Sequence, residues 1–576
     1  MRRYFSLLIT LLVLGACASD ILSTTDDPIA GSGDNAPDGS ISETEFTGNV
    51  SVVFGGSEAV VTGADGQFST VVNGNSVAIT YTGGENVFYT LSGSAADGSF
   101  KLYSDVRQAV KLSNLSLTNP SGAAIDIQSG HLTYMELEGA STLSDGASAA
   151  YSSGSEDCKA VLFSEGSLMF SGSGSLTVNA VNSKEKSGIV SDDHITFGEG
   201  PSIAISTGIG AGHGVKVNEY VLVSGGILNI SAKAATKSGI KADNYFGMTG
   251  GTVTISNSAN GGKGLRAGDY DYDEKEHKLD DSYISGGVLR VTTTGSEVND
   301  ESAKGIKIGY KESATKAGWG PGGGNYVYAG NLKISGGSVY VSSARSEGLE
   351  AKGNLDISGG QVYVYSGGDD AINCQGEMTI TDGYVCGYST GNDALDSNGN
   401  MKIYGGFVMA ICTRGTPEVG LDANTEGGYK LYIYEGATVV AYGGLEGGYS
   451  SEQTVYSMSG VSGGSGVSGG SGSAGGSGSA GGSGSAGGWN ALWDGSSFIA
   501  AFKCPANVSS FAVCGPALST TCYKGVSVGG DTFCEGCWAV DGISGGTAVT
   551  LGTYSGGGGG PGGGGGGGGG PRPPGW

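Results

Sequence analysis

Short runs of alternating apolar and polar residues recur along most of the chain, with turn residues between them. In the run 251–255, Val253 and Ile255 would point to one side and Thr254 to the other, because successive side chains of a strand face opposite ways. A Gly-Gly pair precedes many of these runs, and glycine accepts the positive φ angles of tight corners. The pattern therefore predicts an all-β protein built from short strands.

A second regularity is a small residue followed by an aliphatic one, mostly at intervals of 23 to 28 residues. Its members are Ala160, Gly188, Gly214, Gly239, Gly264, Gly305, Gly348, Ala371, Ala394 and Gly420. Repeats of this period are typical of solenoids. We therefore predict a parallel β-helix over residues 46–445, in which equivalent residues of successive coils form columns. Two longer intervals hold insertions, 269–277 and 310–326, which we expect as loops on one face.

The first residues have the pattern of an export signal. Two arginines precede a short apolar run that is too short to span a bilayer, and Leu14-Gly15-Ala16-Cys17 follows. This tetrapeptide resembles a bacterial lipobox, which implies a lipoprotein signal peptide in residues 1–17 that is cleaved just before Cys17. Cys17 would then be the lipidated first mature residue of a lipid-anchored protein of the bacterial outer membrane or cell surface. The alternative is an ordinary signal peptide with a chance cysteine. Residues 18–45 are polar and read as a flexible tether.

The end of the chain differs in composition. Residues 446–488 are rich in Gly and Ser and predict a flexible linker, residues 489–554 a small Cys-rich β module, and residues 555–576 a disordered Gly/Pro tail. The module holds Cys504, Cys514, Cys522, Cys534 and Cys537. Export makes disulfides plausible, but their pairing stays open, and a single CxxC motif is weak support for zinc.

The chain is acidic, and this excludes one class of partner. It has 576 residues, of which 55 are Asp or Glu and 30 are Lys or Arg. Such a balance argues against nucleic acid as a partner. The four histidines lie in no motif, so a Ser or Cys catalytic triad is unsupported. We expect a monomer.

One outward-facing column consists almost entirely of charged residues. Two residues after each small residue, successive coils carry Lys216, Lys241, Arg266, Lys307, Glu350, Asn373, Asp396 and Asp422. Like charges one coil apart repel each other. A polyanionic glycan along the four basic residues and a divalent cation among the acidic ones would compensate this repulsion. The alternative is that the side chains are solvated and that salt screens them.

The acidic part of the column lies within a cluster of oxygen-bearing side chains. Its members are Asp369, Asp370, Asn373, Asn392, Asp393, Asp396 and Asp422, with Asn398 and Asn424 beside them. Calcium takes six to eight hard oxygen ligands, so the cluster predicts a calcium site. The alternative is that these residues form turns and stack as an amide ladder. Asp192, Asp243 and Asn244 are second-rank candidates at the equivalent corner of earlier coils.

Tyrosines also stand outward at coil spacing, Tyr340 and Tyr363 at one position and Tyr365 and Tyr388 two residues later. Such a column predicts a platform on which sugar rings stack. The alternative is the ordinary preference of tyrosine for strands.

The joint order of the repeats resembles a bacterial carbohydrate-binding β-helix family. The resemblance covers roughly residues 45–445, and a weaker resemblance covers residues 489–553. The motifs that carry it are 88–93 (FYTLSG), 119–125 (NPSGAAI), 188–192 (GIVSD), 239–243 (GIKAD) and 391–396 (GNDALD). The resemblance implies a secreted right-handed parallel β-helix that carries calcium and is similar in fold to family-nine pectate lyases. It also implies binding of cellulose and of acidic plant polysaccharide such as polygalacturonate.

These observations favour a lipid-anchored, calcium-stabilised protein that binds polysaccharide without cleaving it. The first alternative is a calcium-dependent polysaccharide lyase, which needs a cation and a basic residue to abstract a proton. Lys352 and Lys402 are the bases nearest the acidic cluster. The second alternative is an adhesin or structural surface protein.

Overall fold

The structure of the protein is a computed structural model, and it describes only part of the chain. The described residues are 41, 44–151, 156–268, 279–313, 326–459, 488–506, 508 and 510–556. The expectations for Cys17, for segment 1–17, for most of the tether and for most of the tail therefore lie outside the described residues. Among the residues that are described, no helix is long and apolar enough to cross a membrane.

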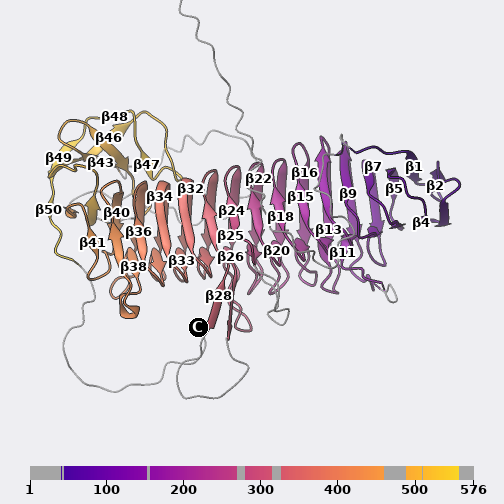
Figure 1. Cartoon of the computed structure of the whole chain (residues 1–576), viewed down its shortest axis with the longest axis horizontal. Helices are drawn as coiled ribbons and strands as arrows, with labels where there is room; N and C mark the ends of the chain where they lie inside the picture. The colour runs from indigo at the N-terminus through magenta and orange to yellow at the C-terminus, as the bar shows by residue number, and fades with distance from the viewer. Residues whose placement is uncertain are drawn as a thin grey trace, which may run out of the picture.

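Most of the described chain is a stack of coils that lie side by side along the long axis (Figure 1). A coil contains three short strands, and each strand pairs in parallel with the equivalent strand of the next coil. The described part holds no α-helix, and its one named helix is the short 3-10 helix η2 (Thr425–Gly427). The all-β class and the parallel strand pairing predicted from the sequence are thus confirmed.

The first strands of the coils form a 14-stranded sheet, which begins with an antiparallel pair and is otherwise parallel. Its strands are β3 (Phe68–Asn73), β4 (Asn75–Tyr81), β6 (Gly98–Tyr103), β8 (Ile125–Gln128), β11 (Ala160–Ser164), β14 (Ser187–Ser191), β17 (Val215–Val217), β20 (Ile240–Ala242), β23 (Leu265–Ala267), β26 (Ile306–Ile308), β31 (Leu349–Ala351), β33 (Ile372–Cys374), β35 (Leu395–Ser397) and β38 (Leu421–Ala423).

The second and third strands of the coils belong to a 28-stranded sheet. The second strands are β9 (Thr133–Glu138), β12 (Leu168–Gly172), β15 (Ile195–Phe197), β18 (Val221–Val223), β21 (Phe246–Met248), β24 (Ser282–Ile284), β29 (Leu332–Ile334), β36 (Met401–Ile403) and β39 (Leu431–Ile433). The third strands are β10 (Ala140–Asp145), β13 (Ser175–Ala180), β16 (Ser202–Thr207), β19 (Ile227–Ala232), β22 (Thr252–Asn257), β25 (Val288–Thr293), β30 (Ser338–Ser343), β37 (Phe407–Cys412) and β40 (Thr438–Tyr442). Some coils run both strands together, as in β32 (Leu355–Ser366) and β34 (Met378–Ser389); β7 (Gln108–Asn119), which pairs with both β9 and β10, does the same near the N-terminal end.

The N-terminal end of the stack contains three longer strands, β1 (Gly48–Phe54), β5 (Val87–Ala95) and β7 (Gln108–Asn119), and the short strand β2 (Val60–Thr62). β1 pairs in parallel with β5 and antiparallel with β2, so β2 covers part of the outermost edge. Covering an edge strand protects its unpaired backbone groups.

The interior of the stack is a continuous apolar core, and the glycine pairs set its corners. Val253 and Ile255 are buried in this core while Thr254 faces outward, as the alternation predicts. The second glycine of each pair has a positive φ, for example +77° at Gly360. A Cβ at Gly360 would also lie 2.7 Å from the backbone of Gly336 in the preceding coil. Glycine is therefore required there both for its backbone angle and for close coil packing.

One insertion forms a hairpin. β27 (Tyr310–Ser313) pairs antiparallel with β28 (Tyr326–Ala329), and the hairpin projects from the side of the stack (Figure 1). The residues between the two strands, and the insertion 269–277, lie outside the described residues.

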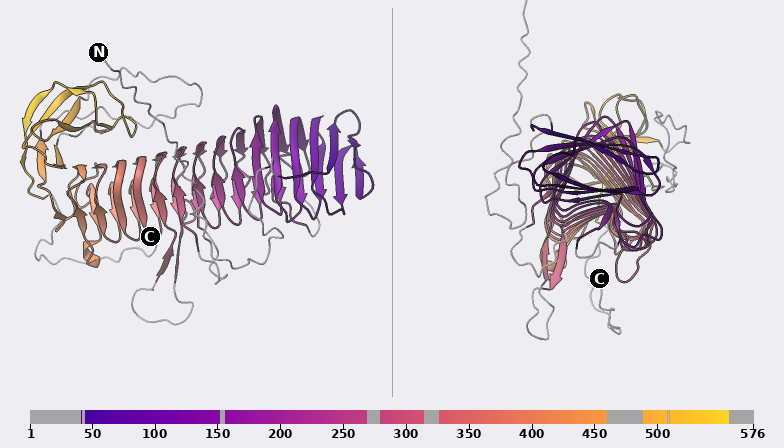
Figure 2. Two further views of the ribbon diagram at one scale, coloured as in Figure 1. Left: turned by 45° about the horizontal axis from the view of Figure 1, so that its top comes forward. Right: turned by 90° about the vertical axis from the view of Figure 1, so that its right-hand side faces the viewer.

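The C-terminal segment continues the stack and then folds back over it (Figure 2). Residues 446–459 contribute β41 (Ser450–Ser451) and β42 (Tyr456–Ser459), so this part of the predicted linker is strand; residues 460–487 lie outside the described part. β45 (Ser510–Cys514) pairs antiparallel with both β40 and β42, and β50 (Gly552–Thr553) pairs with β42. The remaining strands form a separate sheet: β43 (Trp489–Trp493), β44 (Phe498–Phe502), β46 (Thr521–Val528), β47 (Trp538–Ala539), β48 (Ile543–Ser544) and β49 (Thr547–Thr550).

Candidate functional site

The structure places the predicted charged column on one face of the 14-stranded sheet, which we call the charged face. Each member pairs in register with the next, in the order Lys216, Lys241, Arg266, Lys307, Glu350, Asn373, Asp396 and Asp422. The side chains point away from the stack interior, yet most are only half-exposed and Glu350 is 2% exposed. A charge in such a position is poorly solvated, so neighbouring charges and hydrogen bonds determine the protonation state of the group.

A second column runs beside the first and was missed in the sequence. It is formed by the residue immediately before each small residue, and it includes Lys263, Lys304, Glu347, Asp370 and Asp393. The small residue that follows each member donates a backbone hydrogen bond to the member of the next coil; for example, Gly305 N donates to Glu347 O. This column also changes from basic to acidic between Lys304 and Glu347. The fixed offset from the small residues is the signal that would have revealed it.

The change of sign is neutralised by buried ion pairs. The Lys304 Nζ atom lies 2.6 Å from Glu347 Oε1 and 2.7 Å from Glu350 Oε2, and Lys352 also pairs with Glu350. Burial by itself raises the pKa of Glu350, but the ammonium groups of Lys304 and Lys352 outweigh it and hold that pKa well below its ordinary value. Lys352, expected to be a candidate base, is thus engaged as a counter-ion.

The basic half of the charged face has an excess of positive charge. Lys241 pairs with Asp243 at 2.9 Å. For Lys216 and Lys307, by contrast, the described part of the chain offers no carboxylate oxygen within 4.0 Å of Nζ. Burial, together with repulsion from Arg266, lowers the pKa of Lys307 to about 8, and burial also lowers the pKa of Lys216. An anion bound here would relieve both penalties.

The acidic half is linked by the Asn373 amide. Its Nδ2 atom donates to Asp370 Oδ2 at 2.9 Å and to Asp396 Oδ2 at 2.7 Å. Asp370 Oδ1 accepts a further bond from the backbone N of Asp393, at 3.0 Å. Asn392 lies in the same corner, where its backbone N donates to Ser389 Oγ. The predicted cluster is therefore spread over successive coils, with an amide between two of its carboxylates.

The carboxylates of this half hold their protons unusually tightly. Burial raises the pKa of Asp369 to about 6 and those of Asp393 and Asp396 to about 7, and neighbouring carboxylates add to the shift. Burial and a hydrogen bond with the Glu446 carboxyl raise the pKa of Asp422 to about 9. Oxygen donors crowded in this way suit a hard cation, which would replace the missing positive charge.

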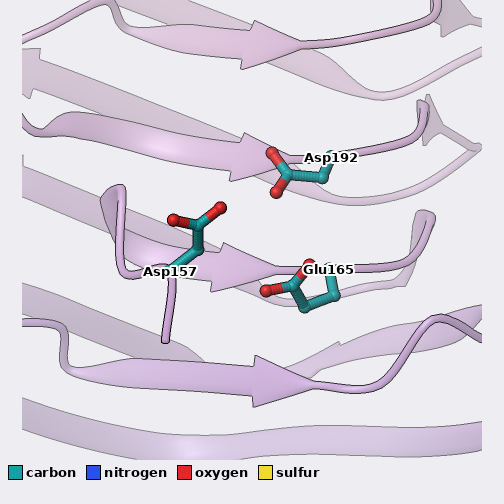
Figure 3. A group of neighbouring side chains, drawn as sticks. All are labelled: Asp157, Glu165 and Asp192. Carbon is teal, nitrogen blue, oxygen red and sulfur yellow. The ribbon is translucent and has the colours of Figure 1, made fainter. Parts of the chain in front are cut away.

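A different group brings carboxylates closer together. Oxygens of Asp157, Glu165 and Asp192 lie within 4.8 Å of one another, the sole such group of three in the described part of the chain, and point toward a common space (Figure 3). The Lys159 Nζ atom already lies 2.7 Å from Asp157 Oδ2 and also pairs with Asp192. An ammonium thus supplies the positive charge that a cation would bring.

The tyrosine column does not form the open platform that the sequence predicts. Tyr363 and Tyr388 pack against a buried core built with the C-terminal segment, and Tyr365 meets Tyr388 edge-on at 5.1 Å between ring centres. The Arg290 guanidinium lies 4.0 Å from the ring centre of Tyr340. Because the C-terminal segment folds back over this face, Tyr363 and Tyr388 serve as packing surface.

Another aromatic column was not foreseen. The rings of His194, Tyr220, Tyr245 and Tyr283 stack along four coils, with centres 4.3, 4.8 and 6.2 Å apart. The three earlier members each stand directly before a second strand, which is the signal that the sequence offered. Their ring faces lie against one another, so the column stabilises the stack more readily than it offers flat surface to a sugar.

Comparison with known proteins finds a family model that matches part of the chain. No curated protein matches the chain. A solved structure of a polysaccharide lyase-like protein from C. thermocellum, a gadolinium derivative, is 23% identical and covers 45% of this chain and 96% of that one, with a TM-score of 0.33. This likeness is too weak to carry an argument. Residues 73–318, which include the whole basic half of the charged face, match the model of a family described as carbohydrate-binding domain-containing protein.

Proposed function

We propose that this protein binds an acidic polysaccharide along the basic half of the charged face and does not cleave it. The observation that carries the proposal is the place of Lys216, Lys241, Arg266 and Lys307. They stand in register on consecutive coils, inside the segment that matches the carbohydrate-binding family model. Parallel coils repeat at about 4.8 Å, so the face presents a row of positive charges to a regular polyanion such as polygalacturonate.

The charge balance supports the same site. Lys307 and Lys216 are half-buried, and their pKa values are lowered mainly by this burial, with repulsion from neighbouring basic residues added. A uronate carboxylate would compensate these positive charges through charge-assisted hydrogen bonds. A neutral glycan such as cellulose would not, so acidic glycan is the better fit for this face.

The architecture that we propose for the binding region is a right-handed parallel β-helix, with calcium stabilising its acidic half. The residues that would hold the ion are the oxygen donors Asp369, Asp370, Asn373, Asn392, Asp393, Asp396 and Asp422. Their raised pKa values and their burial support a cation there. Leu14-Gly15-Ala16-Cys17 supports a lipid anchor at Cys17 and a place on the bacterial outer membrane or cell surface.

The test is retention on insoluble polygalacturonate and on cellulose, with and without a chelator. We expect retention on polygalacturonate that weakens with salt and falls at least tenfold in a Lys216→Ala/Lys307→Ala double variant. Lys233→Ala is the matched control, since Lys233 is exposed and lies in the same family-matched segment. Equal retention by both variants would count against this site, and no retention on either glycan would favour an adhesin.

A polysaccharide lyase is the second candidate, and one observation favours it. Lys307 has a pKa of about 8, so part of it is neutral near physiological pH and able to take a proton. It pairs in register with Glu350, one coil before the acidic half. A lyase would release unsaturated product that absorbs in the ultraviolet, and the Lys307→Ala variant would abolish that signal. Binding without such product supports the first proposal.

A further inference from the structure

Five cysteines from distant parts of the chain share one buried core. Cys386 stands on β34 of the stack, whereas Cys504, Cys522, Cys534 and Cys537 belong to the C-terminal segment. All five are thiols in this structure. The core joins the outer face of the third strands to the segment that covers it, so a bond made there would connect two regions about 150 residues apart in sequence.

The turn 533–538 lies directly on β34. The Phe533 ring stacks on the Tyr384 ring with centres 3.9 Å apart and planes 3° from parallel. The Cys534 thiol donates to Tyr384 O at 2.9 Å, and the Trp538 indole Nε1 donates to Val385 O at 3.5 Å. Three consecutive contacts therefore fix this turn beside Cys386.

The backbone of the same turn directs Cys537 inward. Cys534, Glu535 and Gly536 have φ angles of 52°, 54° and 81°, a left-handed run that is uncommon for residues other than glycine. The backbone N of Cys537 closes the turn on Cys534 O at 3.1 Å. Cys537 thus enters the buried core that also holds Cys386, and its side chain is the main cause, ahead of burial, of the raised pKa of the Cys386 thiol.

We propose that Cys386 and Cys537 form a disulfide that fastens the C-terminal segment to β34. One cysteine thiolate attacks a small-molecule or protein disulfide and releases one thiol, and the second cysteine then displaces the other half. Two cysteine thiols lose two protons and two electrons, and the donor disulfide leaves as two thiols. This cross-link does not depend on the proposed glycan site.

Other fates of these thiols fit less well. The Cys534 sulfur is engaged by the carbonyls of Tyr384 and Val362, and its backbone N donates to Gln361. In the described part of the chain no three cysteine sulfurs lie within 4.8 Å of one another, as a closed zinc site would need. The pair that we infer to form the disulfide is therefore Cys386 with Cys537.

The test is to refold the full chain from denaturant with oxidised and reduced glutathione. Free thiols are then blocked with N-ethylmaleimide, and peptides are identified by mass spectrometry. We expect a cross-linked peptide that joins Cys386 to Cys537 in the native chain. The control variant Cys374→Ala should also give this peptide, because the native Cys374 side chain is buried in the stack interior, away from Cys537. Cys386→Ala should lack it. A Cys534–Cys537 bridge, retained zinc or unchanged free thiols would overturn the proposal.

A second measurement covers the case in which Cys386→Ala does not fold. Thermal unfolding of the native chain is compared before and after reduction with dithiothreitol. Since a cross-link that closes a long loop stabilises the folded state, we expect the oxidised form to melt several degrees higher, and the difference to vanish in Cys537→Ser. A difference that persists in Cys537→Ser, or no difference in the native chain, would contradict the cross-link.

Discussion

Lys304 lies 2.7 Å from the Glu350 carboxylate at the coil where the charged face changes from basic to acidic. The two residues belong to neighbouring columns of neighbouring coils, and Lys304 also reaches Glu347. This contact joins the part of the face that holds Lys307 to the part that holds Asn373, Asp396 and Asp422. The charged face is thus one continuous surface, which is basic at one end and acidic at the other.

Replacing Lys304 with Met should destabilise the protein. Glu350 would keep only Lys352 as counter-ion, and Glu347 would lose its ammonium. Removing one partner of a buried ion pair costs about 3–5 kcal/mol, which urea unfolding can measure. The double variant Lys304→Met/Glu350→Gln should recover much of this loss. Equal stability of the single variant and the native chain would show that the pair contributes little.

The affinity for polygalacturonate should fall as pH rises through about 8, where Lys307 loses its charge. Stability should change in the opposite direction. The folded pKa is lower than the ordinary value of 10.5, so the charged form is penalised in the folded state. That penalty is complete below pH 8 and disappears as pH approaches 10.5.

The measurements are binding isotherms and urea unfolding from pH 7 to 10. Lys307→Met should remove the contribution of Lys307 to the pH dependence of both affinity and stability, whereas Lys233→Met should leave both pH dependences unchanged. Opposite slopes for affinity and stability are the distinguishing result, since a general loss of structure would lower both together.

Calcium should raise the melting temperature, and the acidic half should be responsible. A ligand that binds only the folded state stabilises it by about 2.7 kcal/mol at a hundredfold excess over its Kd. Asp393→Ala/Asp396→Ala should abolish most of this gain. With chelator the same variant should be no less stable than the native chain, since it removes like-charge repulsion. Asp531→Ala, on an exposed residue, is the control. A calcium effect that survives in the double variant would place the ion elsewhere.

Trp538→Ala should loosen the C-terminal segment from the stack. Trp538 is fully buried between the two, and truncating a buried tryptophan costs about 3–5 kcal/mol. Under reducing conditions, Cys386 should then react faster with a maleimide. Trp493→Ala is the matched control, since Trp493 packs on Phe498 and Tyr523 away from β34. Equal reactivity in both variants would argue that the segment opens independently of this contact.

The sequence by itself determined the repeating part of this protein. Small residues at intervals of 23 to 28 predicted which residues would stand in the same column, and Lys216 and Lys241 do stand opposite each other. Parallel coils have a fixed spacing and a two-residue alternation, so a regular pattern is enough to set their register. The positive φ of Gly360 follows from the same regularity.

Only the tertiary structure decided what lies against each column. Nothing periodic connects Tyr384 with Phe533, so the covering of Tyr363 and Tyr388 could not be read from the repeats. In the same way, the pairing of Lys304 with Glu350 depends on how far a long side chain reaches between two columns. Local patterns fix the backbone of a repeat, whereas contacts between distant segments depend on how side chains pack after the chain has folded.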